Sequence, residues 1–194
     1  MKIFTSDLHF GHKNILKYTN RHTEFNSIEE HDIGLIEIWN CNVGPDDDVY
    51  HLGDFAFISD YNKLRAIVQK LNGQKYFIAG NHDNIQHMQR LVDEGWINSI
   101  SHYKEIKIGD YKAVLCHYPM SSWNRQHHGS FMLHGHTHGG LNPEFNKGRI
   151  LDVGLDNYYK QFGNHDFYYD IDIIDQLGNK PIYTNDEHEP RKGE

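Results

Sequence analysis

The stretch Lys75-Tyr76-Phe77-Ile78-Ala79-Gly80-Asn81-His82-Asp83 decides the fold. Residues 75–79 are typical of a buried strand, and a polar cluster follows the strand at once. Four more polar clusters stand at or just after a predicted strand: Asp7-Leu8-His9, Gly53-Asp54, Cys116-His117 and Gly135-His136-Thr137-His138. Because ligands gather beyond the carboxyl ends of the strands in open α/β sheets, the five clusters are predicted to converge on one site.

The elements between these clusters indicate an α/β fold. In the first half, strands expected at 2–6, 48–52 and 75–79 alternate with helices expected at 13–21, 27–39, 60–71 and 85–94. This alternation is typical of parallel crossover units. The second half is rich in strands, which are expected at 103–108, 112–116, 131–134, 149–153 and 167–174, with a hairpin turn at Gly109-Asp110.

Length and composition limit the class of protein. The 194 residues suit one domain, expected over 1–184, with a polar tail at 185–194. The formal net charge of -8 disfavours stable nucleic-acid binding, which needs a clustered positive surface. No apolar run approaches the roughly 20 residues that span a bilayer, and the N-terminus lacks a signal peptide's features. We therefore expect a cytoplasmic protein with no membrane partner; the oligomeric state stays open.

The residue types in the five clusters point to metal binding. The chain has 16 histidines, and imidazoles, Asp carboxylates and an Asn carbonyl suit Mn²⁺, Fe, Zn²⁺ or Ni²⁺. Two such ions about 3.5–4 Å apart need a bridging carboxylate, and Asp54 is placed for it. Since alternate residues of an extended segment point the same way, Asp7 with His9 and His136 with His138 are predicted to act as ligand pairs.

The ordered motifs resemble those of the calcineurin-like metallophosphoesterase superfamily: DxH, GD, GNH[DE], H and GHxH. The match runs from Asp7 to His138 and is complete. The resemblance implies a four-layer α/β/β/α sandwich of two mixed sheets flanked by helices. It also implies two divalent metal ions, with manganese the first expectation and iron, zinc or nickel the others. The ligands it implies are Asp7, His9, Asp54 and His138 for one metal, and Asp54, Asn81, His117 and His136 for the other.

The resemblance also implies phosphoester hydrolysis. Phosphoprotein phosphatases of the superfamily carry GDxxDRG and GNHE, whereas here no Arg follows Gly53-Asp54 and Asp83 replaces the Glu. The chain is more similar to small bacterial or phage members that act on phosphodiesters. We therefore expect a phosphodiesterase on a small or nucleotide-like substrate, in which a metal-activated hydroxide attacks phosphorus and His82 is the catalytic residue that assists the leaving group. A phosphomonoesterase and a non-catalytic protein-binding scaffold are the alternatives.

Several residues near the motifs admit two interpretations. Asp83 either takes part in catalysis by orienting His82 or caps the following helix. His12 is expected to reach the substrate phosphate, although it could merely begin a helix. Arg125 and His127 lie in a loop, 123–128, that either overhangs the site and clamps a phosphate or is ordinary surface.

Other charged and imidazole side chains have simpler explanations. Lys13, Lys17 and Arg21 share one face of the helix expected at 13–21 by their i, i+4 spacing. A solvated face is the simpler interpretation, and a stripe that steers the substrate is the other. His51 and His134 precede motif residues and are expected to pack or to support the ligands.

Overall fold

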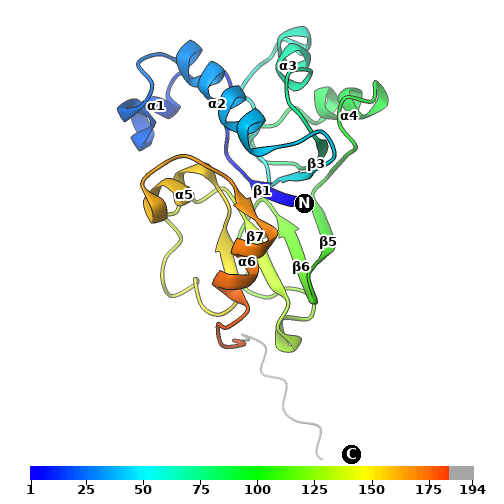
Figure 1. The fold of residues 1–194 in the computed structure, drawn as a ribbon, viewed down its shortest axis with the longest axis vertical. Helices are drawn as coiled ribbons and strands as arrows, with labels where there is room; N and C mark the ends of the chain where they lie inside the picture. The colour runs from blue at the N-terminus through cyan, green and yellow to red at the C-terminus, as the bar shows by residue number, and fades with distance from the viewer. Residues whose placement is uncertain (184–194) are drawn as a thin grey trace, which may run out of the picture.

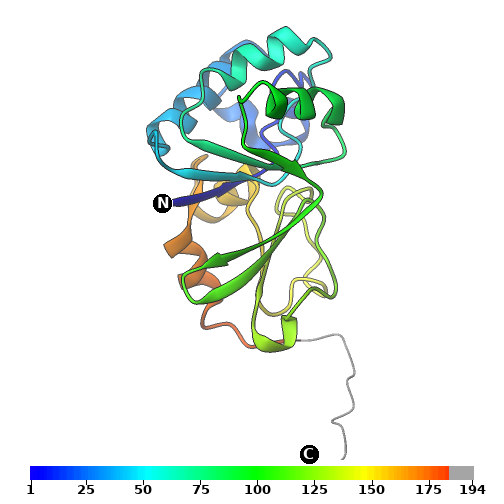
Figure 2. The ribbon, with the colours of Figure 1, turned by 90° about the vertical axis from the view of Figure 1, so that its right-hand side faces the viewer.

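The computed structural model describes residues 1–183, which fold into two β-sheets packed against each other with helices around them (Figures 1 and 2). The first sheet has five strands in the order β4-β3-β2-β1-β9, and the second has four in the order β5-β6-β7-β8. Each sheet contains both parallel and antiparallel pairs. The expected α/β sandwich of two mixed sheets flanked by helices is confirmed.

The first sheet takes most of its strands from the N-terminal half of the chain. These strands are β1 (Lys2–Thr5), β2 (Asp48–His51), β3 (Gln74–Ile78), β4 (Ser99–Ser101) and the late strand β9 (Tyr168–Tyr169). The helical elements of the same half are α1 (Ile15–Tyr18), the 3₁₀ helix η1 (Asn20–Thr23), α2 (Ile28–Asn42), α3 (Tyr61–Val68) and α4 (Ile85–Asp93). Because β1, β2 and β3 pair in parallel, their carboxyl ends meet at one edge.

The second sheet comes from the C-terminal half. Its strands are β5 (Tyr103–Ile108), β6 (Tyr111–Cys116), β7 (Phe131–His134) and β8 (Ile150–Asp152), and its helical elements are η2 (Gln126–His128), α5 (Leu155–Phe162) and α6 (Asp170–Leu177). β5 and β6 form the expected hairpin. β6, β7 and β8 run in parallel, so their carboxyl ends also share one edge.

Two apolar clusters hold the layers together, one on each face of the first sheet. Ile3 and Val49 pack with side chains of α2, α3 and α4, while their chain neighbours Phe4 and Tyr50 pack toward the second sheet. Successive side chains of a strand point to opposite faces, so both faces of β1 and β2 are buried. This burial explains why the two central residues of each strand, Ile3-Phe4 and Val49-Tyr50, are both apolar.

Three elements differ from the sequence predictions. The helix expected at 13–21 is interrupted at Thr19, whose backbone is extended (φ -129°, ψ 174°) between α1 and η1. The strand expected at 167–174 is mostly helix: α6 begins at Asp170, and the Asp172 carboxylate accepts a hydrogen bond from the Tyr169 N–H (2.8 Å). β4 and α5 have no counterpart among the predicted elements.

The polar tail expected at 185–194 lies outside the described residues. Every helix within residues 1–183 is too short or too polar to cross a membrane.

Candidate metal centre

The five polar clusters meet where the carboxyl edges of the two sheets adjoin. Asp7, Asp54 and Asn81 follow strands of the first sheet, whereas His117 and His136 follow strands of the second. The backbone N–H of His136 donates to both oxygens of the Asp7 carboxylate (3.1 and 3.0 Å), which joins the two sheets at this edge. The predicted convergence of the clusters is therefore observed.

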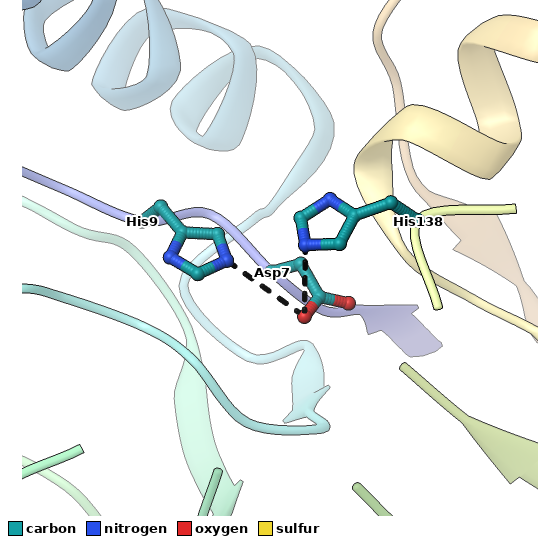
Figure 3. Close-up of side chains that lie close together, drawn as sticks. All are labelled: Asp7, His9 and His138. Atoms are coloured by element: carbon teal, nitrogen blue, oxygen red, sulfur yellow. Dashed lines mark ion pairs between the residues drawn. The ribbon is translucent and has the colours of Figure 1, made fainter. Parts of the chain in front are cut away.

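One group of possible ligands consists of Asp7, His9 and His138, and we call it the first group (Figure 3). The two imidazoles each turn a ring nitrogen toward Oδ1 of Asp7, at 4.0 Å for His9 Nε2 and 3.9 Å for His138 Nε2. These separations are too long for hydrogen bonds. They suit donors of one cation, because atoms about 2.1 Å from the same ion lie about 3–4 Å apart.

A second group consists of Asp54, His117 and His136, with the side chain of Asn81 between the two imidazoles. Oδ1 of Asn81 lies 3.0 Å from His117 Nε2 and 3.1 Å from His136 Nδ1. Oδ2 of Asp54 lies 3.5 Å from His117 Nε2 and also 3.8 Å from His9 Nε2 of the first group. Asp54 therefore stands between the two groups, the position predicted for it from the sequence.

The hydrogen bonding of His9 shows that the first group fits a metal ion. His9 is 2% exposed, yet neither of its ring nitrogens has a hydrogen-bond partner among the described residues. A buried polar group without a partner is unfavourable, so such groups are rare in proteins. A cation bound to Nε2 would provide the missing partner.

The backbone of the ligands is held in an uncommon conformation. Among the described non-glycine residues, six have a positive φ, and five of these are proposed ligands with φ between 48° and 68°: Asp7, His9, Asp54, His136 and His138. Side chains with a Cβ disfavour this left-handed region, and such residues concentrate at functional sites. The fold thus fixes the ligand positions through the backbone itself.

Burial and neighbouring groups shift the pKa values of His9, Asp7 and Asp54. Burial, and next the positive charge of Arg21, lower the pKa of His9 to about 2, so its ring is neutral and can donate a lone pair. Burial raises the pKa of Asp7 to about 7, so its carboxylate needs a nearby cation to stay ionised. Burial alone would raise the pKa of Asp54, but hydrogen bonds from His117 and from the His82 N–H hold it below the ordinary value. Neutral imidazoles and ionised carboxylates are the forms that bind metal ions.

Asp83 ties together the loops that follow β2 and β3. Its Oδ2 accepts hydrogen bonds from the N–H groups of Asp54 and Gly80, and its Oδ1 accepts one from Phe55, all at 2.9 Å. The predicted N-cap role is wrong, because the N-cap of α4 is Asn84. The role of Asp83 in orienting His82 stays a prediction, and the contacts of its carboxylate are to backbone N–H groups. Asp83 is a positioning residue for the metal centre.

Arg21 and Asp156 support the first group, and sequence reasoning missed this role for both. Arg21 is fully buried, and its guanidinium donates to Asp156 from Nε (3.0 Å) and from Nη2 (2.8 Å). It also donates to the carbonyl oxygens of Leu8 (2.8 Å) and Asp7 (2.5 Å). Asp156 Oδ2 lies 2.6 Å from Nδ1 of His138. A carboxylate on the second nitrogen of a ligand histidine fixes its tautomer and orientation.

The solvated-face interpretation of residues 13–21 is therefore wrong for Arg21. α1 ends before the break at Thr19, so Arg21 does not share a helical face with Lys17. Lys13 precedes α1, and both lysines are exposed as expected. Asp156 gives no sequence signal, because it lies in α5, an element that the sequence pattern did not predict.

His82 and His12 lie at the rim of the centre. The His82 side chain is 38% exposed, and its Nε2 is 4.0 Å from Oδ2 of Asp54. The ring of His12 lies 5.3 Å from that of His9 and 6.0 Å from that of His82. Both rings are placed to contact a group bound at the centre, and their roles in binding and catalysis stay predictions.

The structure does not bring Arg125 and His127 into this group of residues. They precede β7, whereas the ligands follow it, so the length of the strand separates them from the centre. Asn124 of the same loop donates to the Glu105 carboxylate (3.0 Å) on β5.

Among the expected supporting residues, His51 and His134 are fully buried. Nδ1 of His51 accepts from the Gly53 N–H (3.3 Å), and Nδ1 of His134 lies 2.8 Å from the Gly135 oxygen.

Comparisons with known proteins place the chain among phage and prokaryotic proteins. No family model matches it. It is 30% identical to the Gene 66 protein of Mycobacterium phage L5 over 201 residues, covering 90% of this chain and 94% of the phage protein. It is 37% identical to an uncharacterized protein of Methanocaldococcus jannaschii over 134 residues, which are 69% of this chain and 66% of that protein. A solved protein of unknown function from Aquifex aeolicus has the same fold, with a TM-score of 0.68 and 23% identity over 91% of this chain and 99% of that one.

Proposed function

We propose that this chain, which belongs to the family of the Gene 66 protein of Mycobacterium phage L5, is a metal-dependent phosphodiesterase that acts on a small or nucleotide-like substrate. The observation that carries the proposal is the pair of ligand groups that share Asp54. A bridging carboxylate between two sets of imidazole and carboxylate donors is typical of dinuclear hydrolytic centres. The ordered motifs of the calcineurin-like metallophosphoesterases in the sequence support the same function.

The donor set fits two divalent cations such as Mn²⁺. Asp7, His9 and His138 would hold one, and Asn81, His117 and His136 the other, with Asp54 between them. Such ions, when bound, polarise a phosphoryl group and make a water molecule nucleophilic near neutral pH. Mixed nitrogen and oxygen donors also admit iron, zinc and nickel.

The side chains around the centre would orient the substrate and move protons. His82 lies beside Asp54 and is partly exposed, so its ring can contact both a bound phosphate and solvent. An imidazole in this position can donate a proton to the departing oxygen as the phosphorus–oxygen bond breaks. His12 faces the same space and would bind a phosphoryl oxygen or the departing group. Asp156 would keep His138 in the tautomer whose Nε2 lone pair faces Asp7.

Removal of the metal ions is expected to abolish hydrolysis. Protein stripped with a chelator should hydrolyse bis(p-nitrophenyl) phosphate no faster than the background reaction, and added Mn²⁺ should restore turnover, because the metal ions make the attacking water nucleophilic. Elemental analysis of the reloaded protein should give two ions per chain. An unchanged rate after stripping, or a reloaded protein that holds no ion, would contradict the proposal.

Replacement of His82 by alanine is expected to lower kcat by about 10²–10³-fold without loss of metal, because a proton donor is removed while every ligand stays. The loss should be larger for a dinucleotide than for a nitrophenyl ester, since nitrophenolate departs without needing a proton. Elemental analysis and kcat for both substrates test this. His128→Ala, an exposed histidine of η2 at the other end of β7, is the control. A His82→Ala protein as fast as wild type on both substrates would show that the role is wrong.

A further inference from the structure

Two hollows adjoin the ring of His82. The larger, about 500 Å³, reaches from His9 and His138 of the first group to Tyr18. The smaller, about 240 Å³, is lined by Phe57, Ile58 and Ser59. The larger hollow begins at ligands of the first group, and the smaller one shares His82 with it, so a group bound beside His82 has space on two sides.

The larger hollow carries no formal charge apart from its histidines. Within residues 1–183, its lining includes no Lys, Arg, Asp or Glu. Its polar groups are imidazoles, the Asn14 amide and the Thr19 hydroxyl, and the apolar side chain of Ile15 lies beside them. A second phosphate would find no fixed cation here, and the chain's net charge of -8 also disfavours a polyanion. This hollow therefore suits an uncharged group that forms hydrogen bonds.

An exposed aromatic ring stands at the edge of each hollow. Tyr18 in the larger hollow is 76% exposed, and Phe57 in the smaller is 55% exposed. The Phe57 ring contacts the rings of both His12 (4.9 Å between centroids) and His82 (5.6 Å). Exposed rings beside a centre that binds phosphate can serve as stacking platforms for planar groups.

We propose that the substrate is a phosphodiester whose two ester groups fill these two hollows, with an uncharged, ring-bearing leaving alcohol such as a nucleoside against Tyr18 and the retained substituent against Phe57. The inference rests on the proposed function and narrows it to a substrate class. The larger hollow is assigned to the leaving group because His12 lines it together with His82 and the ligands His9 and His138, whereas, among the described residues, His82 is the one histidine that lines the smaller hollow. A monoester would leave one hollow empty.

The reaction balances with water as the only co-reactant. The water oxygen forms a new bond to phosphorus, and the bond between phosphorus and the leaving oxygen breaks. His82 donates its proton to the leaving oxygen and regains one from the attacking water. The products are a phosphomonoester, which keeps the substituent beside Phe57, and the free alcohol, which departs past Tyr18.

Three esters with one leaving group test the assignment: bis(p-nitrophenyl), methyl p-nitrophenyl and p-nitrophenyl phosphate. For the Mn²⁺-loaded protein, kcat/KM should fall in that order. The methyl ester lacks the second aromatic ring, and the monoester lacks a second ester group altogether. Tyr18→Ala should lower kcat/KM about tenfold for both diesters, the order of effect of one stacking contact. Phe57→Ala should lower it about tenfold for the diaryl ester and less than about twofold for the methyl ester.

Phe145→Ala is the matched control, since Phe145 is an exposed ring (63%) that lines a different hollow. It should change none of the three values, and circular dichroism and metal content should match wild type in every variant. If the protein hydrolyses diesters but neither Tyr18→Ala nor Phe57→Ala alters kcat/KM for any of the three esters, the hollows are not substrate subsites, although the proposed function stands. A monoester preferred over both diesters also overturns the inference. Absence of Mn²⁺-dependent hydrolysis of all three esters overturns the proposed function and this inference together.

Discussion

Replacement of Arg21 by methionine is expected to lower the free energy of unfolding by about 3–5 kcal/mol, the usual effect of removing one partner from a buried ion pair. The side chain of Arg21 is fully buried and binds Asp156 through two nitrogens. The substitution leaves that carboxylate buried without its cation, and the carbonyl oxygens of Asp7 and Leu8 lose their donors. Urea unfolding of chelator-treated protein measures the effect apart from any contribution of bound metal.

Three further variants make this experiment specific. Lys17→Met removes an exposed cation from the helical face to which the sequence analysis also assigned Arg21. It should change the free energy of unfolding by no more than about 0.5 kcal/mol. Arg21→Lys should recover little stability, because an ammonium group cannot reproduce the two-nitrogen contact. Arg21→Met combined with Asp156→Leu should destabilise less than the sum of the single changes, since no buried charge is left unpaired. If the free energy of unfolding of the Arg21→Met protein were within about 1 kcal/mol of the wild-type value, the stabilising role of Arg21 would be contradicted.

Replacement of Asp54 by asparagine is expected to lower kcat on the order of 10³-fold, or about 4 kcal/mol in activation free energy. Oδ2 of Asp54 faces His9 on one side and His117 on the other, so the change removes a negative charge from both ligand groups. The amide oxygen can still accept the His82 N–H bond that Oδ1 now accepts (2.9 Å), so the loop should keep its shape. Elemental analysis should show fewer than two ions per chain.

The control for this change is Asp110→Asn, which alters a fully exposed carboxylate in the turn between β5 and β6. It should bind two ions and turn over at the wild-type rate. If Asp54→Asn also kept two ions per chain and full activity, Asp54 would not be the shared ligand, and the dinuclear proposal would have to be abandoned.

The ligand positions were predictable from sequence because each one follows a strand. Alternation of strands and helices places strand ends at one edge, and short polar motifs identify which ends carry ligands. The residues brought together in this way, from Asp7 to His138, are those that the motifs named. The left-handed backbone of five of them was not predicted, because aspartate and histidine adopt a positive φ more often than most residues with a Cβ but still only in a small minority of cases.

The supporting contacts were not predictable, because they depend on tertiary structure. Helical periodicity assigned Arg21 to a solvated face, but the extended backbone at Thr19 reorients it toward Asp156, 135 positions away in sequence. Residues 167–174 alternate in a way that favours a strand, yet the Asp172 cap and the burial of Ile173 and Leu177 favour α6. The position of the loop 123–128 followed from the direction of β7, which short motifs do not give.

The contacts of Asp83 have a consequence for how the centre moves. One carboxylate binds the amides of Asp54, Phe55 and Gly80, so neither of the two loops can separate from the sheet edge without breaking bonds to the other. These three amide protons should exchange with solvent deuterium through a shared opening event. Release of the bound ions would then be a concerted step, in which both halves of the centre loosen at once.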